Sequence, residues 1–168
     1  MSQGTAKDVA AVVRAAGELV GRTRLQKTVA LLELARVGYG FSFNYYKFGP
    51  YSEDLVESAD RAVALGYVSE EERRAAWGGR YSIFKASHAE PTGSVARDTL
   101  IRIAKEADAV ALELAVTAAF LADEGAKDPW SEVESRKPDK RGSLRKAKEL
   151  YREFLKVEGL PQPLPTIV

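Results

Sequence analysis

Few residues of this chain have side chains suited to catalysis or metal binding. The sequence contains one histidine, His88, and no cysteine, which excludes thiolate nucleophiles, disulfides and cysteine-rich metal sites. His88 lies in an expected loop without a nearby nucleophile or ligand partner, so we interpret it as an ordinary surface residue. Zinc needs three or four convergent ligands, and no spacing in the sequence supplies them. We therefore predict that the protein binds no metal and no cofactor.

The sequence also lacks the loops that nucleotide-binding and hydrolytic enzymes use. It contains no G-x-x-x-x-G-K phosphate loop, no G-x-G-x-x-G turn after a strand and no G-x-S-x-G elbow. A group of carboxylates remains at Glu53, Asp54, Glu57 and Asp60, which an exposed helix face with an acidic N-terminus explains. A hydrolase or nuclease that used a divalent metal would need at least two acidic side chains to converge in a pocket. The favoured interpretation is a protein without enzymatic activity.

The clearest structural pattern is a helix followed closely by a strand. Apolar residues at steps of three and four predict a helix over about 24–37, which Gly38 and Gly40 end. Alternating apolar and polar residues then predict a strand from Phe41 to Tyr46.

A Gly49-Pro50 corner ends this expected strand, because proline has no amide hydrogen to donate. Ser52 is placed to cap the next helix. Gln26 and Lys27 lie among buried neighbours on the preceding helix, so we expect their polar ends to bond to carbonyl groups of the corner. This corner would fix how the helix, the strand and the next helix meet.

The remaining pattern predicts an α+β, mainly helical fold. A winged-helix-like module with a small antiparallel hairpin occupies about residues 1–88, and a helical C-terminal part over 94–168 packs on it in one compact unit. We expect further helices over about 7–19, 53–65, 94–123 and 143–157, the last capped by Ser143. Strands are expected at 67–68 and 80–84, joined by a long turn over 69–79. The other segments are a linker over 86–93, an irregular segment over 127–142 and an extended tail.

Two arginines, Arg22 and Arg24, precede the helix over 24–37. Positive charge at a helix N-terminus is unfavourable by a few tenths of a kcal/mol. We interpret them as two solvated loop arginines, and the alternative is that they have acidic partners or a ligand.

Charge is distributed unevenly, although the net charge is only +1. Residues 52–72 hold seven acidic side chains and one basic one, which gives −6, whereas residues 136–156 hold nine basic and three acidic ones, which gives +6. An acidic recognition helix would be repelled by DNA phosphates. We therefore favour a protein partner with a basic face, and nucleic acid is the alternative. The expected protein-binding residues are Tyr46, Tyr51, Glu53, Asp54 and Glu57, and those for the nucleic-acid alternative are Arg73, Arg74, Arg80, Lys140, Arg141, Arg145 and Lys148.

No apolar run approaches the roughly 20 residues that span a bilayer, and residues 1–10 lack an apolar core segment. The sequence thus predicts a soluble cytoplasmic protein without a membrane partner.

The segment Ala109–Leu121 contains one charged residue, Glu113. Such a helix needs cover from neighbouring helices, and a homodimer contact is the alternative.

Several short motifs within residues 23–155 are similar to those of YwgA-like proteins, an uncharacterised prokaryotic family, and more distantly to the Panacea domain. Panacea domains act as antitoxins and proteolytic adaptors by binding other proteins. The resemblance implies this fold and an antitoxin or adaptor function, although this chain departs from Panacea domains in its longer wing and its corner residues. The motifs are Leu25-Gln26-Lys27, the corner Tyr46–Ser52, Leu65-Gly66-Tyr67-Val68, Arg136-Lys137-Pro138 and Ala147-Lys148-Glu149-Leu150.

Overall fold

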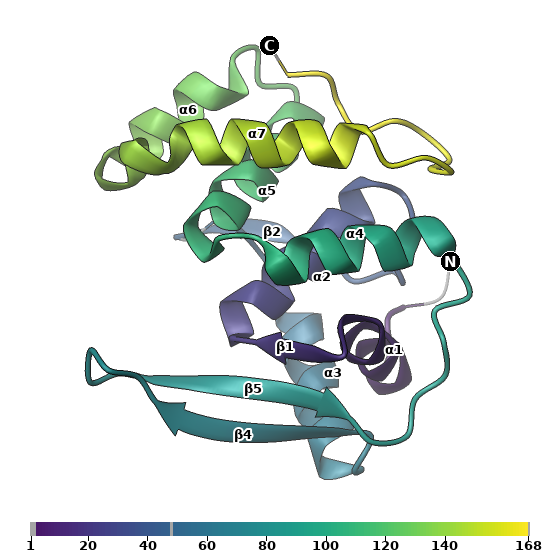
Figure 1. Cartoon of the computed structure of the whole chain (residues 1–168). Helices are drawn as coiled ribbons and strands as arrows, with labels where there is room; N and C mark the ends of the chain where they lie inside the picture. Colours follow the sequence, from purple (N-terminus) through teal and green to yellow (C-terminus); the bar gives the residue numbers. More distant parts are fainter. Residues whose placement is uncertain (1–2, 48, 168) are drawn as a thin grey trace.

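The computed structural model describes residues 3–47 and 49–167, and the fold is α+β and mainly helical (Figure 1). The N-terminal part contains the winged-helix elements and a small inserted hairpin. In chain order these elements are α1 (Ala6–Ala16), β1 (Glu18–Val20), α2 (Arg22–Leu34), β2 (Asn44–Tyr46), β3 (Gly49–Tyr51), α3 (Glu53–Ala64), β4 (Val68–Arg74) and β5 (Arg80–Ala86). The helical part that follows contains α4 (Val95–Glu106), α5 (Ala109–Asp123), α6 (Pro129–Arg136), the 3₁₀ helix η1 (Pro138–Ser143) and α7 (Leu144–Leu155).

The antiparallel sheet has the strand order β1-β5-β4, which is the arrangement of a winged helix. Strand β1 corrects the expected first helix over 7–19, because α1 ends at Ala16 and Gly17 adopts a φ of +78°. Leu19 then pairs with Phe84 of β5 and is fully buried. A hydrophobic residue that continued the helical stripe therefore belongs to a strand.

The hairpin of β4 and β5 is longer than the sequence predicted. The charged segment Ser69–Arg74, expected within a long turn, is paired along its whole length with β5. Charged residues suit this strand because it lies at the edge of the sheet and most of its side chains face water. Figure 1 shows the hairpin extending at the end of the molecule opposite α7.

The sequence predicted that the Gly49-Pro50 corner ends a strand. Strand β2 does end before the corner, at Tyr46, but Gly49 and Pro50 themselves begin β3, the second strand of a hairpin that was not predicted. Tyr45 faces Pro50 across this pair and Tyr46 faces Gly49. The expected strand from residue 41 is also shorter, since β2 begins at Asn44. The loop before β2 is held by Glu33, whose carboxylate accepts hydrogen bonds from the backbone N–H groups of residues 39–41 at 2.9–3.1 Å.

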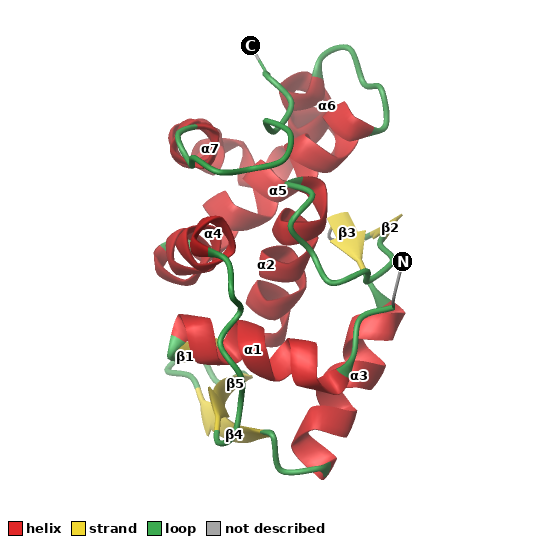
Figure 2. Ribbon diagram, turned by 90° about the vertical axis from the view of Figure 1, so that its right-hand side faces the viewer, coloured by secondary structure: helices red, strands yellow, loops and turns green. Residues whose placement is uncertain are grey.

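Helix α5 lies at the centre of the molecule and packs against α2, α6 and α7 (Figure 2). The expected single helix over 94–123 is interrupted at Ala107 and Asp108, where the Asp108 carboxylate accepts a hydrogen bond from the Ala111 N–H and begins α5 anew. Leu114 is 0% exposed in the single chain, so helices of the same chain cover it.

The C-terminal segments differ from expectation in two places. Residues 129–136 of the expected irregular segment form α6, with Pro129 in its first turn and Asp128 as its N-cap. Within the described residues Ser143 makes no capping hydrogen bond to α7. The tail after α7, expected to be extended, forms no helix or strand in the described residues. It packs back on the core, where Leu164 is buried and the Tyr151 hydroxyl donates to the Pro165 carbonyl. No helix in the described ranges is long and apolar enough to cross a membrane.

Candidate functional site

The Gly49-Pro50 corner is held by two polar side chains of α2. The Gln26 amide donates to the Ser52 carbonyl at 2.9 Å and accepts from the Ser52 N–H at 2.8 Å. The Lys27 Nζ donates to the Pro50 carbonyl at 2.8 Å. These contacts confirm the expectation that the polar ends of Gln26 and Lys27 form hydrogen bonds with backbone groups at the corner. The side-chain amide of Gln26 thus satisfies both backbone groups of Ser52, as a neighbouring β-strand would.

Close packing of β3 on α5 explains why glycine stands at position 49. Its φ is +95°, and an added Cβ would lie 2.4 Å from the Thr117 Oγ1. The Thr117 hydroxyl donates to the Glu113 carbonyl one turn earlier at 2.7 Å, which fixes its position. The corner is therefore clamped between α2 and α5.

A cluster of charged side chains lies beneath the corner, and sequence reasoning missed it. Glu113 is 6% exposed and its Oε2 lies 2.6 Å from the Lys140 Nζ and 3.2 Å from the Lys137 Nζ. Lys27 is 2% exposed. Burial lowers the pKa of Lys27 to about 8, nearby Glu113 opposes this change, and Lys137 and Lys140 reinforce it. The only sequence signal was a glutamate within an apolar helix.

A groove of about 170 Å³ lies between α2 and α3. Leu25, Leu55 and Ala59 are buried residues along it, and Val56 is a half-buried one. Tyr51 of β3 also lines the groove, so the corner and the groove are continuous. The groove was not predicted, because its walls come from helices that are separated along the chain by the inserted hairpin.

Tyr46 and Tyr51 form an exposed aromatic pair on the inserted hairpin. Their ring centroids lie 5.4 Å apart in an edge-to-face arrangement, and they are 47% and 37% exposed. The other expected protein-binding residues occupy the first two turns of α3, where Glu53 and Glu57 are exposed and Asp54 is half-buried. Ser52 caps this helix as predicted, since its hydroxyl accepts from the Leu55 N–H at 3.1 Å. The chain thus places all five residues on adjoining elements.

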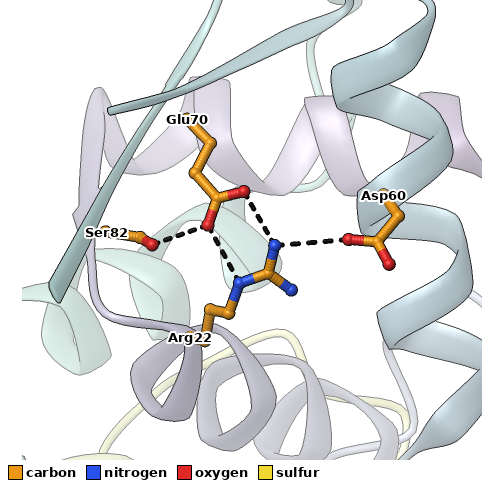
Figure 3. A network of polar contacts seen from close by, with 4 residues as sticks. All are labelled: Arg22, Asp60, Glu70 and Ser82. Carbon is orange, nitrogen blue, oxygen red and sulfur yellow. Dashed lines mark hydrogen bonds and ion pairs between the residues drawn. The ribbon is translucent and has the colours of Figure 1, made fainter. Parts of the chain in front are cut away.

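Arg22 joins α2 to α3 and to the sheet (Figure 3). Its guanidinium lies 2.7 Å from Glu70 of β4 and 3.2 Å from Asp60 of α3, and the Ser82 hydroxyl donates to the same Glu70 carboxylate at 2.6 Å. The hydrogen bond from Arg22 holds the pKa of Glu70 below its usual value, and Ser82 adds to this effect against the opposing effect of burial.

The interpretation of Arg22 and Arg24 as solvated loop arginines is wrong. Both lie within α2, where Arg22 has acidic partners. Arg24 donates to the carbonyl groups of Ala104 and Ala107 at 2.8 and 2.7 Å. Carbonyl groups in the last turn of a helix have no partner within the helix, and these bonds supply one, so Arg24 ties α2 to the helical C-terminal part.

Expected nucleic-acid residues of the wing lie next to carboxylates. Arg73 lies 3.2 Å from Glu71, and Arg80 lies 3.3 Å from Glu72. Near the tip of the hairpin, Trp77 is 79% exposed. The wing thus presents an aromatic ring within a mixed-charge surface.

Basic residues of the C-terminal part do not join those of the wing. Lys140 contacts buried Glu113, Arg145 lies 3.4 Å from Glu149, and the Lys148 Nζ lies 5.9 Å from the centre of the Trp130 ring. Arg141 is exposed on η1. Figures 1 and 2 place α7 and the wing at opposite ends of the molecule, so these two groups do not form one basic surface.

Acidic side chains do not assemble a metal site in the part of the chain that the structure describes, since no three or more His, Asp or Glu residues converge there. His88 is exposed, as expected.

No family model, curated protein or solved structure matches this chain. The assignment of the site therefore depends on its own geometry.

Proposed function

We propose that this protein is a non-enzymatic interaction module that binds another protein through the Gly49-Pro50 corner and the acidic helix α3. The exposed Tyr46–Tyr51 pair carries the proposal. Aromatic residues are enriched in the cores of protein interfaces, where they bury large area at a small entropic cost. The pair is held on a short hairpin that Gln26 and Lys27 fix to α2.

Charge supports a partner with a basic face. Glu53, Asp54 and Glu57 lie next to the aromatic pair in the first turns of α3, whereas Asp60 and Glu70 of the same acidic segment are paired with Arg22. Complementary charge raises the association rate and excludes acidic partners. By its resemblance to Panacea domains, we assign the module to the antitoxin or adaptor type, and we place its action in the cytoplasm.

Co-purification from the native host tests the proposal. We expect a basic protein to accompany the tagged wild-type chain, and the double variant Tyr46→Ala/Tyr51→Ala to lose it by at least tenfold. Trp77→Ala removes an aromatic residue of the wing that is even more exposed than the two tyrosines, and this variant is expected to retain the partner. The proposal fails if the wild-type protein purifies alone and toxicity of proteins encoded beside it does not depend on it.

A nucleic-acid-binding regulator is the second candidate, and the exposed Trp77 among the wing arginines favours it. An aromatic ring with neighbouring arginines can stack on a base and contact phosphates. Phosphate-driven binding weakens steeply between about 50 and 200 mM salt. Binding of this kind that Trp77→Ala abolishes, and that Tyr46→Ala/Tyr51→Ala leaves unchanged, would replace the first candidate. Absence of a mobility shift at low salt would dismiss the second.

A further inference from the structure

From the groove between α2 and α3 we infer the chemistry of the partner segment: one large apolar side chain, of the phenylalanine or leucine kind, next to lysine or arginine. This inference rests on the proposed function and adds a second contact to it. The anchor would enter the groove beside Tyr51, and its cationic neighbours would meet the carboxylates of α3.

Volume identifies the occupant as one side chain. Sites for small molecules and cofactors usually enclose about 300–1,000 Å³, and this groove holds about 170 Å³. An apolar cavity of about 150 Å³ accepts benzene, so the groove matches one phenyl or isobutyl group. Gln26 and Lys27 also line the groove, but their polar ends are bonded to the backbone of Ser52 and Pro50. The apolar side chains of Leu25, Leu55 and Ala59 therefore favour such an anchor over a polar ligand.

The outer rim of the groove is acidic. Glu53 lies three residues before Val56 on α3, so the two are neighbours on the helix surface, whereas Asp60, four residues after Val56, is already paired with Arg22. Glu57 follows on the same exposed side. A cation attached close to the anchor would therefore come within reach of these carboxylates.

Arg22 and Tyr51 mark the extent of the groove. Arg22 lines the groove, but its positive charge is balanced by ion pairs with Glu70 and Asp60. It therefore adds little repulsion toward a cationic partner. At the corner, Tyr51 belongs to both the groove and the exposed aromatic pair. A segment anchored in the groove would thus continue across Tyr51 and Tyr46.

A defined peptide tests this inference without the native partner. The probe is a soluble 12-residue peptide with one central phenylalanine flanked by lysines, titrated into protein labelled with ¹³C on its methyl groups. We expect the methyl signals of Leu25, Leu55 and Val56 to shift. Replacing the phenylalanine by alanine, or the lysines by glutamates, should weaken binding at least tenfold.

Two substitutions fill the groove from opposite walls. Val56→Trp changes a half-buried residue of α3, and Thr23→Trp changes an exposed residue of α2 that also lines the groove, so at least one is expected to fold as the wild type does. Both should weaken peptide binding at least tenfold. Ala64→Trp is the matched control, since Ala64 is exposed on α3 outside the groove.

Each outcome separates this inference from the proposed function. Absence of methyl shifts at 1 mM peptide, or unchanged binding to both folded groove variants, overturns the inference. If the native partner still co-purifies with the groove variants and is lost from Tyr46→Ala/Tyr51→Ala, the proposed function stands alone. If the protein self-associates, and the groove variants abolish this, a second copy of the chain is the occupant and the inference is wrong.

Discussion

Lys27 combines burial, positive charge and a structural contact in one residue. Its ammonium group donates to the Pro50 carbonyl, while its side chain is almost inaccessible to water. Burial lowers its pKa from 10.5 to about 8, and this shift is a stability effect because the unfolded chain keeps the ordinary value. Between these two pH values the unfolded state binds more protons than the folded state. The free energy of unfolding therefore rises with pH in this window.

We predict that Lys27→Met removes this dependence on pH. For the wild type, Lys27 should add about 2 kcal/mol to the free energy of unfolding between pH 7.5 and 9.5. Urea unfolding at several pH values measures it. The range ends below pH 10 because burial raises the pKa of Tyr151 and of Tyr39, whose ionisation would favour the unfolded state at higher pH.

Lys127→Met is the control, since Lys127 is exposed and the charge change is the same. It should leave the wild-type slope intact. Equal slopes for the wild type and Lys27→Met would show that the ammonium group is not desolvated in the folded protein.

Gly49 gives a second prediction at the scale of one residue. Gly49→Ala should lower the free energy of unfolding by at least about 2 kcal/mol, because it combines a positive φ with a contact between the new Cβ and Thr117. Gly125→Ala isolates the backbone effect, since Gly125 has a similar φ of +97° and nothing within 4 Å of its added Cβ. That variant should lose about 1 kcal/mol. Similar losses in both variants would rule out the close packing of β3 on α5.

At the scale of elements, two serines that look alike in sequence have different roles. The Ser52 hydroxyl caps α3, whereas Ser143 makes no such bond to α7 within the described residues. We predict that Ser52→Ala lowers the free energy of unfolding by about 1 kcal/mol and that Ser143→Ala changes it by less than about 0.5 kcal/mol. Denaturant titration of both variants decides this. An equal loss would mean that Ser143 caps α7 in solution.

Local patterns predicted the elements whose signals lie within a few residues. Ser52 followed by Glu53 and Asp54 marks a helix start, and the structure has it there. The contact from Lys27 to the corner was also predictable, because a polar residue among buried ones needs a nearby backbone partner. Leu19 was assigned to the wrong element because its pairing with Phe84 spans most of the N-terminal part and leaves no local signal.

Most of the candidate site depends on such distant contacts. Glu113 meets Lys137 and Lys140 only after α5, α6 and η1 have packed together. The groove requires α2 and α3 to lie side by side, with the inserted hairpin placed beside them. The sequence predicts the exposed tyrosines, because they flank the Gly49-Pro50 corner, and the exposed acids, because they lie at the start of an amphipathic helix. It does not predict a concave surface, which arises from tertiary packing.

At the scale of the whole molecule, α2 links the winged-helix part to the helical part. It packs against α4 and α5, and Arg24 bonds to carbonyl groups at the end of α4. A fragment of residues 1–88 would expose the apolar face of α2 to water. We predict that this fragment does not fold by itself and that the full chain unfolds in one transition. Coincident fluorescence and circular dichroism curves would support this, and a cooperative transition of the isolated fragment would contradict it.

The central helix α5 provides the final prediction. Leu114 is fully buried by the same chain, so a charge there cannot reach water without opening the packing with α2 and α7. Leu114→Glu should therefore abolish folding, seen as loss of the cooperative thermal transition. Ala109→Glu, at the exposed first turn of the same helix, should fold normally because a negative charge is favourable there. A soluble, folded Leu114→Glu monomer derived from a dimeric wild type would mean that α5 is covered by a second subunit.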